Sequence, residues 1–189
     1  MVILETDRLF IRDYKRSDLS DLHRLLSDKQ TMYFLDDIST DTLEESAQNL
    51  ETVLLNADGH YFCICKKETN EYIGSIGYTV MANTPLGKVV HLGYFLFSQQ
   101  HGNGYATEAV RKVIEFAFLR DGCIRMTTAC YKENEPSRKV MEKAGFQKEG
   151  ERIKAQYHDG VMKDRLEYGF NKDDFCPAMT EARGSRCVN

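Results

Sequence analysis

The chain has 189 residues, a formal net charge of −4 at pH 7 and 42% hydrophobic residues. This length suits one domain with a sizeable core, and the composition is ordinary for a globular protein. The mildly acidic balance gives no support to direct nucleic-acid binding, which usually shows a strongly basic domain or stripe.

The sequence predicts neither a sorting signal nor a metal site. The opening segment MVILETDRLFIRDY lacks the basic stretch and long apolar run of a secretory signal, and no apolar run reaches the roughly 18 residues of a membrane helix. Because no two cysteines form a CxxC pair, we expect no metal site and mostly buried free thiols in a reducing compartment. The prediction is a cytoplasmic protein without a membrane partner; its six cysteines are Cys63, Cys65, Cys123, Cys130, Cys176 and Cys187.

The first third of the chain predicts one strand followed by two helices. Residues 2–14 mix apolar and charged positions as an opening strand does. A first helix begins near Ser17, which can cap it, and a second follows Thr40 or Asp41. Their apolar faces carry Leu19, Leu22, Leu25 and Leu26 in the first helix and Leu43, Ala47, Leu50 and Leu54 in the second.

Three strands come next in the sequence. Aromatic and β-branched residues mark strands at 60–65 and 72–80, and the polar stretch KKETNE between them predicts a hairpin turn. A further strand at 89–97, VVHLGYFLF, leads directly into a glycine loop.

The second half predicts a helix at 103–118, a strand at 124–131, a helix at 135–145 and a final hairpin. The hairpin strands are 146–156 and 161–170, and residues 174–189 show no periodicity. This order of elements predicts a mixed sheet with helices on its faces rather than a regular βα alternation.

The segment QQHGNGYATEAV, residues 99–110, predicts an anion site. Two glycines precede a helix whose first N–H groups are unpaired and carry partial positive charge, so phosphate can approach the backbone closely. A P-loop is excluded because no Lys-Ser or Lys-Thr follows. The dinucleotide fingerprint is only half matched, since Thr107 stands where a third glycine belongs.

The surroundings of this loop resemble the GNAT N-acetyltransferase superfamily, and more narrowly its ribosomal-protein-alanine (RimJ/RimL-like) branch. That branch reads GYWL…WGKGYATEA and then N-x-x-S…EKxGF, and the resemblance spans roughly residues 2–171 here. The matching positions are Gly93-Tyr94, Gly102, Gly104 to Ala109, Asn134, Ser137, Glu142-Lys143 and Gly145-Phe146.

The resemblance implies an α/β (α+β) fold with three α-β-α layers. Its central sheet is mixed, largely antiparallel, twisted and splayed, with about seven strands and four helices. We expect one acetyltransferase domain over 1–171 and a loosely ordered tail over 172–189.

The resemblance also implies that the phosphates belong to acetyl-CoA, with no metal. The pyrophosphate lies on the loop and helix start, where a histidine departs from the usual Gln or Arg at the first position. The pantetheine arm pairs with the backbone near Leu96 and Phe97, and Asn134 bonds cofactor or backbone amides. The loop residues are His101, Gly102, Asn103, Gly104, Tyr105, Ala106 and Thr107.

Acetyl transfer to an amine needs a base, and a proton for the leaving thiolate. His91 stands where the branch often carries a glutamate, and its ordinary pKa near 6.5 suits a base at neutral pH. A packed strand histidine, with a water relay as base, is the alternative. Ser137, at the N-x-x-S position, is proposed in the branch to protonate the thiolate, but it equally suits a helix-start hydrogen bond. Met141 replaces the tyrosine that other superfamily members use.

The resulting hypothesis is an acetyl-CoA-dependent N-acetyltransferase that acts by direct attack of a primary amine on the thioester. The acceptor is a protein N-terminus, such as that of a ribosomal protein, or a small amine, and a homodimer stays open. The alternatives are a non-catalytic coenzyme-A-binding regulatory module and a nucleotide-binding module on the same loop.

Overall fold

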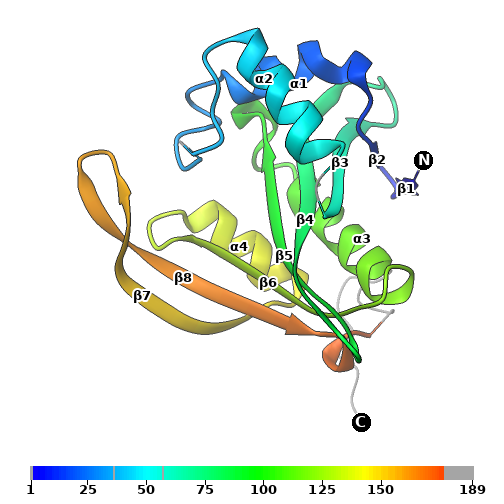
Figure 1. Cartoon of the computed structure of the whole chain (residues 1–189), viewed down its shortest axis with the longest axis vertical. Coiled ribbons are helices and arrows are strands. Elements are labelled where there is room, and N and C mark those ends of the chain that lie inside the picture. Colours follow the sequence, from blue (N-terminus) through cyan, green and yellow to red (C-terminus); the bar gives the residue numbers. More distant parts are fainter. Residues whose placement is uncertain (1, 36, 57, 177–189) are drawn as a thin grey trace.

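The computed structural model describes residues 2–35, 37–56 and 58–176, and eight strands within these ranges form one sheet (Figure 1). The order across the sheet is β1-β2-β3-β4-β5-β6-β8-β7. The strands are β1 (Ile3–Glu5), β2 (Leu9–Asp13), β3 (Gly59–Lys66), β4 (Tyr72–Thr84), β5 (Gly87–Leu96), β6 (Cys123–Tyr131), β7 (Gln147–His158) and β8 (Val161–Asn171).

The helices lie on both faces of this sheet. They are α1 (Leu19–Leu26), α2 (Leu43–Asn49), α3 (Tyr105–Leu119) and α4 (Glu135–Ala144), with short turns η1 (Arg16–Asp18), η2 (Leu50–Leu54), η3 (Ser98–Gln100) and η4 (Lys172–Asp174). Residues of α3 and α4 form one buried cluster with one face of the sheet, and residues of α1 and η2 form a second cluster with the other face. The predicted three-layer fold with a mixed sheet is therefore confirmed.

The sheet opens between its two central strands. The described strand pairs are antiparallel except β5 with β6, which is parallel and joins only Lys88–His91 to Cys123–Thr127. Beyond these residues β5 stays paired with β4, and β6 stays paired with β8. The two pairs diverge, so the sheet splits into a V (Figure 1). Residues 92–96 and 128–131 line the inner edges of this splay.

The strand count is eight, where about seven were expected, because the predicted opening strand over 2–14 is a hairpin. Thr6 ends β1: its N–H donates to the Leu9 carbonyl at 3.0 Å, and its Oγ1 accepts from the Leu9 N–H at 2.8 Å. The bend reverses the chain, and β1 pairs antiparallel with β2.

Two helices begin later than predicted. The helix expected from 103 starts at Tyr105, because Gly102 and Gly104 are left-handed, with φ of 79° and 81°. The helix expected after Thr40 or Asp41 starts at Leu43. Thr42 caps it through a capping box with Glu45.

The C-terminal end of the described chain packs on the core. Of the tail predicted over 172–189, Lys172–Asp174 form η4, and the Phe175 ring lies 5.6 Å from that of Phe118. Residues 177–189 lie outside the described residues. No described helix combines the length and apolarity needed to cross a membrane.

Four cysteines are buried free thiols, as predicted: Cys63, Cys65, Cys123 and Cys130. Cys176 is disulfide-bonded, against that prediction. Cys187 lies outside the described residues.

Candidate active site

The glycine loop exposes the start of α3. Positive φ at Gly102 and Gly104 turns the chain sharply from η3 into the helix, a conformation that favours glycine. Within the described chain, no residue accepts a hydrogen bond from the N–H groups of Tyr105, Ala106 or Thr107. These amides and the helix dipole are therefore open to an anion, and the anion site itself stays a prediction of the sequence.

An arginine from the opening hairpin stands beside this loop. Arg8 donates from Nη1 to the Asn103 carbonyl at 3.0 Å and from Nε to Glu108 at 2.8 Å. Its guanidinium carbon lies 4.6 Å from the centroid of the Tyr105 ring. Sequence reasoning missed Arg8, because about 95 residues of chain separate it from the loop that it contacts. It places a half-exposed guanidinium, ion-paired with Glu108 at 2.6 Å, beside the anion site.

The predicted pantetheine contacts lie at the end of β5. The Phe97 N–H donates to the Ile73 carbonyl at 3.1 Å, so it faces β4 rather than the splay. Because backbone groups alternate in direction along a strand, those of Tyr94 and Leu96 face the splay. The Leu96 carbonyl already accepts from His101 Nε2 at 3.0 Å, which ties the glycine loop to β5.

Asn134 and Ser137 begin α4 on the other side of the splay. Asn134 caps the helix by accepting from the Ser137 N–H at 3.1 Å. The hydroxyl of Tyr94, on β5, lies 3.0 Å from Ser137 Oγ and donates to the Ser137 carbonyl at 3.0 Å. A tyrosine and a serine are thus joined across the opening; the sequence matched Tyr94 to the family pattern but predicted no role for it.

The hydroxyl pair and a neighbouring thiol stay protonated at neutral pH. Burial raises the pKa of Tyr94 well above its ordinary value. Burial also raises the pKa of Cys130 to about 11, and its thiol lies close enough to Ser137 for a hydrogen bond. This side of the splay therefore presents proton donors rather than bases.

His91 lies on the opposite face of β5. It stands three positions before Tyr94, and an odd spacing along a strand places side chains on opposite faces. Its Nδ1 lies 3.0 Å from Thr127 Oγ1, and that hydroxyl donates its one proton to the Val90 carbonyl at 3.2 Å. Nδ1 must then be the donor to Thr127, which leaves the Nε2 lone pair free.

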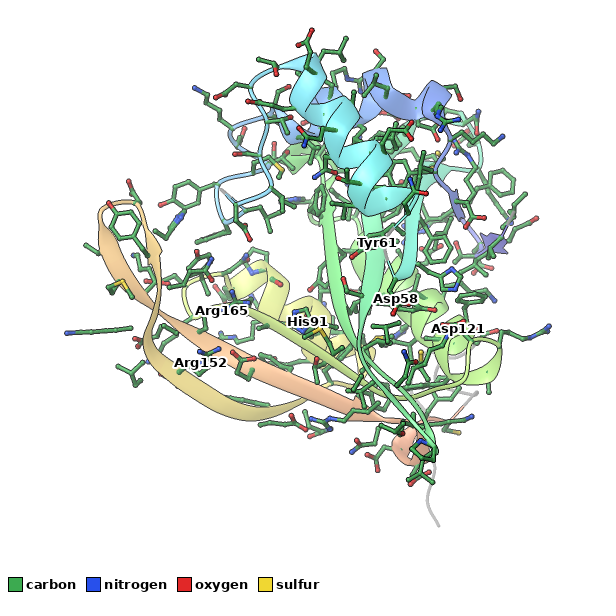
Figure 2. The ribbon with its side chains drawn as sticks, in the orientation of Figure 1. Asp58, Tyr61, His91, Asp121, Arg152 and Arg165 are labelled. Atoms are coloured by element: carbon green, nitrogen blue, oxygen red, sulfur yellow. The ribbon has the colours of Figure 1, made fainter. Side chains whose placement is uncertain are left out.

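The environment of His91 keeps it neutral. Burial lowers the pKa of His91 and the charge of Arg165 lowers it further, against a smaller opposing effect of Glu167. A neutral imidazole with a free Nε2 can accept a proton at pH 7. Figure 2 shows His91 and Arg165 together in the opening between the two arms of the sheet.

An aromatic cluster closes this opening toward the tip of the β7–β8 hairpin. Its four rings come from the α1–α2 connection, β6 and β7, and neighbouring centroids lie 4.8 to 5.6 Å apart. His158 in the cluster also lines a cavity of about 400 Å³ beside Met32 and Thr40. The cluster consists of Tyr33, Phe34, Tyr131 and His158.

The structure thus brings the predicted residues together in two groups. The glycine loop, Leu96, Asn134 and Ser137 lie around the splay, and His91 lies on the far face of β5. The Phe97 side chain packs in the cluster under α1 and η2 instead. No three His, Cys, Asp or Glu residues of the described chain are grouped so as to hold a metal.

Comparison with known proteins agrees with this geometry. The model of the acetyltransferase (GNAT) domain matches residues 8–147. An uncharacterised N-acetyltransferase of Bacillus licheniformis, p20, is 33% identical over 155 residues, which cover 79% of this chain and 85% of the relative. YoaA, an uncharacterised N-acetyltransferase of Bacillus subtilis, is 27% identical over 90% of this chain and 97% of its own length.

Solved structures share the fold. Ribosomal-protein-S5-alanine acetyltransferase of Vibrio fischeri superposes with a TM-score of 0.76 and 26% identity, covering 94% of this chain and 100% of its own. RimL, a ribosomal L7/L12 α-N-protein acetyltransferase in complex with coenzyme A, gives a TM-score of 0.81 at 20% identity, over 90% of this chain and 98% of its own.

Proposed function

The chain belongs to the GNAT acetyltransferase family and is an N-acetyltransferase, and from this premise we propose that it moves the acetyl group of acetyl-CoA to a primary amine by direct attack. Acetyl-CoA supplies the thioester, whose C–S bond breaks as the C–N bond to the acceptor forms. The remaining work, which is binding, orientation and proton transfer, belongs to the side chains and amides of this chain.

The residues of the splay fit coenzyme A. The open amides at the start of α3 suit the pyrophosphate, and Arg8 adds positive charge beside them. The inner edge of β5, at Tyr94 and Leu96, offers backbone groups without a strand partner to the amides of the pantetheine arm. Asn134 contributes by fixing the start of α4, which forms the opposite wall.

Two proton transfers follow from the side chains. His91 Nε2 takes the proton that the acceptor amine loses, and it is neutral and unpaired at that nitrogen among the described residues. The Ser137 hydroxyl gives a proton to the departing thiolate, and Tyr94 positions it. An α-amino group has an ordinary pKa near 8, so a weak base such as a neutral imidazole can take its proton.

One observation carries this proposal. His91 and Tyr94 lie three positions apart on β5, on opposite faces, at the point where β5 separates from β6. Tyr94 is hydrogen-bonded to Ser137. A thioester carbon in the splay would therefore have a base on the acceptor side and a hydroxyl on the sulfur side.

The structural relatives cover two acceptor classes. RimL is a ribosomal-protein N-acetyltransferase and a relative in fold from Vibrio cholerae is a spermidine N-acetyltransferase, with a TM-score of 0.79. For this chain we propose a primary amine as the acceptor, without choosing between these two classes. A cytoplasmic location and a homodimer stay predictions: the four buried free thiols fit a reducing compartment, whereas the disulfide of Cys176 does not.

Turnover tests the proposal against a non-catalytic coenzyme-A-binding module. The purified protein is incubated with acetyl-CoA and three acceptor sets, namely free amino acids, peptides with a free N-terminus and polyamines, and acetylated products are measured by mass spectrometry. Product from at least one set, lost with the cofactor omitted, supports the transferase. Saturable acetyl-CoA binding without product from any set contradicts it.

A further inference from the structure

Arg165 on β8 faces the acceptor side of the sheet. Leu166, Tyr168 and Phe170 of the same strand point into the core under α3 and α4. By strand alternation, Arg165 and Glu167 point to the other face, where His91 lies. The effect of both charges on the pKa of His91 agrees with this placement.

The guanidinium of Arg165 lacks a carboxylate partner in the described part of the chain. Its Nη1 donates to the side-chain oxygen of Gln156, which is neutral. Its Nε is closed to water and has no hydrogen-bond partner among the described residues. The neighbouring Arg152, by contrast, lies 3.7 Å from a Glu167 oxygen. A buried N–H of a charged group without a hydrogen-bond partner costs free energy of folding. An anion bound here would remove that cost.

The free edge of this guanidinium has the geometry of a carboxylate site. With Nη1 occupied, Nε and Nη2 remain, and this edge can donate two parallel hydrogen bonds to one carboxylate. The guanidinium carbon lies 6.0 Å from the centroid of the Tyr131 ring, which braces one face of the group. The side chain as a whole is half-buried although Nε itself is covered, so a carboxylate that binds this edge must displace that cover.

Glu167, which Arg152 also approaches at 3.7 Å, supplies the complementary charge two residues along. Two residues of a strand span about 7 Å, and both side chains lie on one face. An acceptor with its ammonium toward Glu167 and His91 and its carboxylate toward Arg165 would match both charges. A polyamine would meet the positive charge of Arg165, and the first carbonyl of a peptide offers no charge to it.

We propose that Arg165 is the acceptor-specificity residue of this enzyme and that the acceptor is a small amine bearing a carboxylate, as a free α-amino acid does. This inference rests on the proposed N-acetyltransferase function. The carboxylate closes on the Nε–Nη2 edge and holds the amine beside His91 Nε2.

The test compares each free amino acid with its own amide, at saturating acetyl-CoA, in the wild type and in Arg165→Met. Removing a charged hydrogen-bond partner is expected to lower kcat/KM for the acid by about 10- to 100-fold, with the amide changed less than about twofold. Arg165→Lys should recover part of the loss, because it keeps the charge without the two-pronged edge. Arg16→Met, at a surface arginine paired with Glu51, is the matched control and should change neither.

Two results overturn the inference. One is a wild type that acetylates the amides, peptides or polyamines as well as the acids; the other is a variant that loses acid and amide activity equally. Thermal unfolding confirms that each variant is folded, and Arg165→Lys carries the test if the methionine variant is not. Turnover of polyamines or peptides alone removes this inference and leaves the transferase standing, whereas no turnover of any amine removes both.

Discussion

At the scale of single residues, the pairing of Tyr94 with Ser137 gives the proposed mechanism two hydroxyls that can serve the leaving thiolate. Both oxygens lie 3.0 Å apart, and Tyr94 also donates to the Ser137 carbonyl. If Tyr94 uses its proton on that carbonyl, the Ser137 hydroxyl keeps its own proton for transfer. The proposed mechanism therefore takes the serine as the donor and the tyrosine as the group that positions it.

Replacing each hydroxyl in turn separates the two roles. Ser137→Ala should lower kcat by about 10²-fold with little change in KM for acetyl-CoA, since general acid catalysis is typically of that size. Tyr94→Phe should cost less, because the serine remains. Steady-state kinetics on both variants checks this. A larger loss in Tyr94→Phe than in Ser137→Ala would reassign the proton donor to the tyrosine.

His91 makes a prediction about pH. Burial, with help from Arg165, lowers the pKa of His91 below its ordinary value near 6.5, so the imidazole stays neutral and able to accept a proton through neutral pH. We expect kcat to fall on the acid side only below pH 6.5. His91→Gln should lower kcat and abolish this acid limb. A limb that survives in the variant would point to a water relay or to the acceptor itself.

At the scale of elements, a buried ion pair joins β2 to the start of α1. Arg12 donates two hydrogen bonds to Asp18, at 2.8 and 2.9 Å, and the Lys15 N–H donates a third. Burial alone would raise the pKa of Asp18, but the bonds from Arg12 and Lys15 outweigh it and its pKa lies below the ordinary value. The pair anchors the helix layer that covers the acceptor face.

Asp18→Asn should therefore destabilise the protein in a pH-dependent way. At pH 7 we expect a loss of about 2–3 kcal/mol in the free energy of unfolding, because the variant leaves Arg12 without its carboxylate. A lowered pKa stabilises above the ordinary value near 4, and this stabilisation disappears as pH falls through the lowered pKa. Urea unfolding of both proteins at pH 7 and below pH 3 measures this. Equal midpoints at pH 7 would contradict the role given to the pair.

Local signals predicted most elements, and side-chain bonds explain the exceptions. Polar residues and glycine predict the hairpin turns at 67–71 and at Asp159–Gly160. In the structure Asn70, Asp159 and Gly160 have the positive φ that such turns use. The break at Thr6 depends on its hydroxyl bonding the Leu9 N–H, and an alternating pattern across residues 2–14 hides it. The start of α3 depends on the positive φ of Gly102 and Gly104, and the spacing of apolar residues does not reveal backbone angles.

At the scale of the whole molecule, the proposed mechanism has the two substrates meet through the splay of the sheet. The glycine loop and α4 face one side, and His91, Arg165 and the aromatic cluster face the other. Motifs in the sequence predicted the loop and Ser137, because each lies within one short segment. Arg8 and Arg165 went unnoticed, since strand pairing over long separations brings them to the site.

The most direct test of this account is calorimetric titration of the protein with acetyl-CoA, with ATP and NAD as controls. We predict saturable binding of acetyl-CoA alone. Gly104→Glu should weaken binding at least about tenfold, because it strains a left-handed position and sets a carboxylate against the pyrophosphate. Gly122→Glu, at a left-handed glycine with open space in the α3–β6 turn, should bind normally. No binding at millimolar acetyl-CoA, or equal losses in both variants, would contradict the placement of the cofactor on this loop.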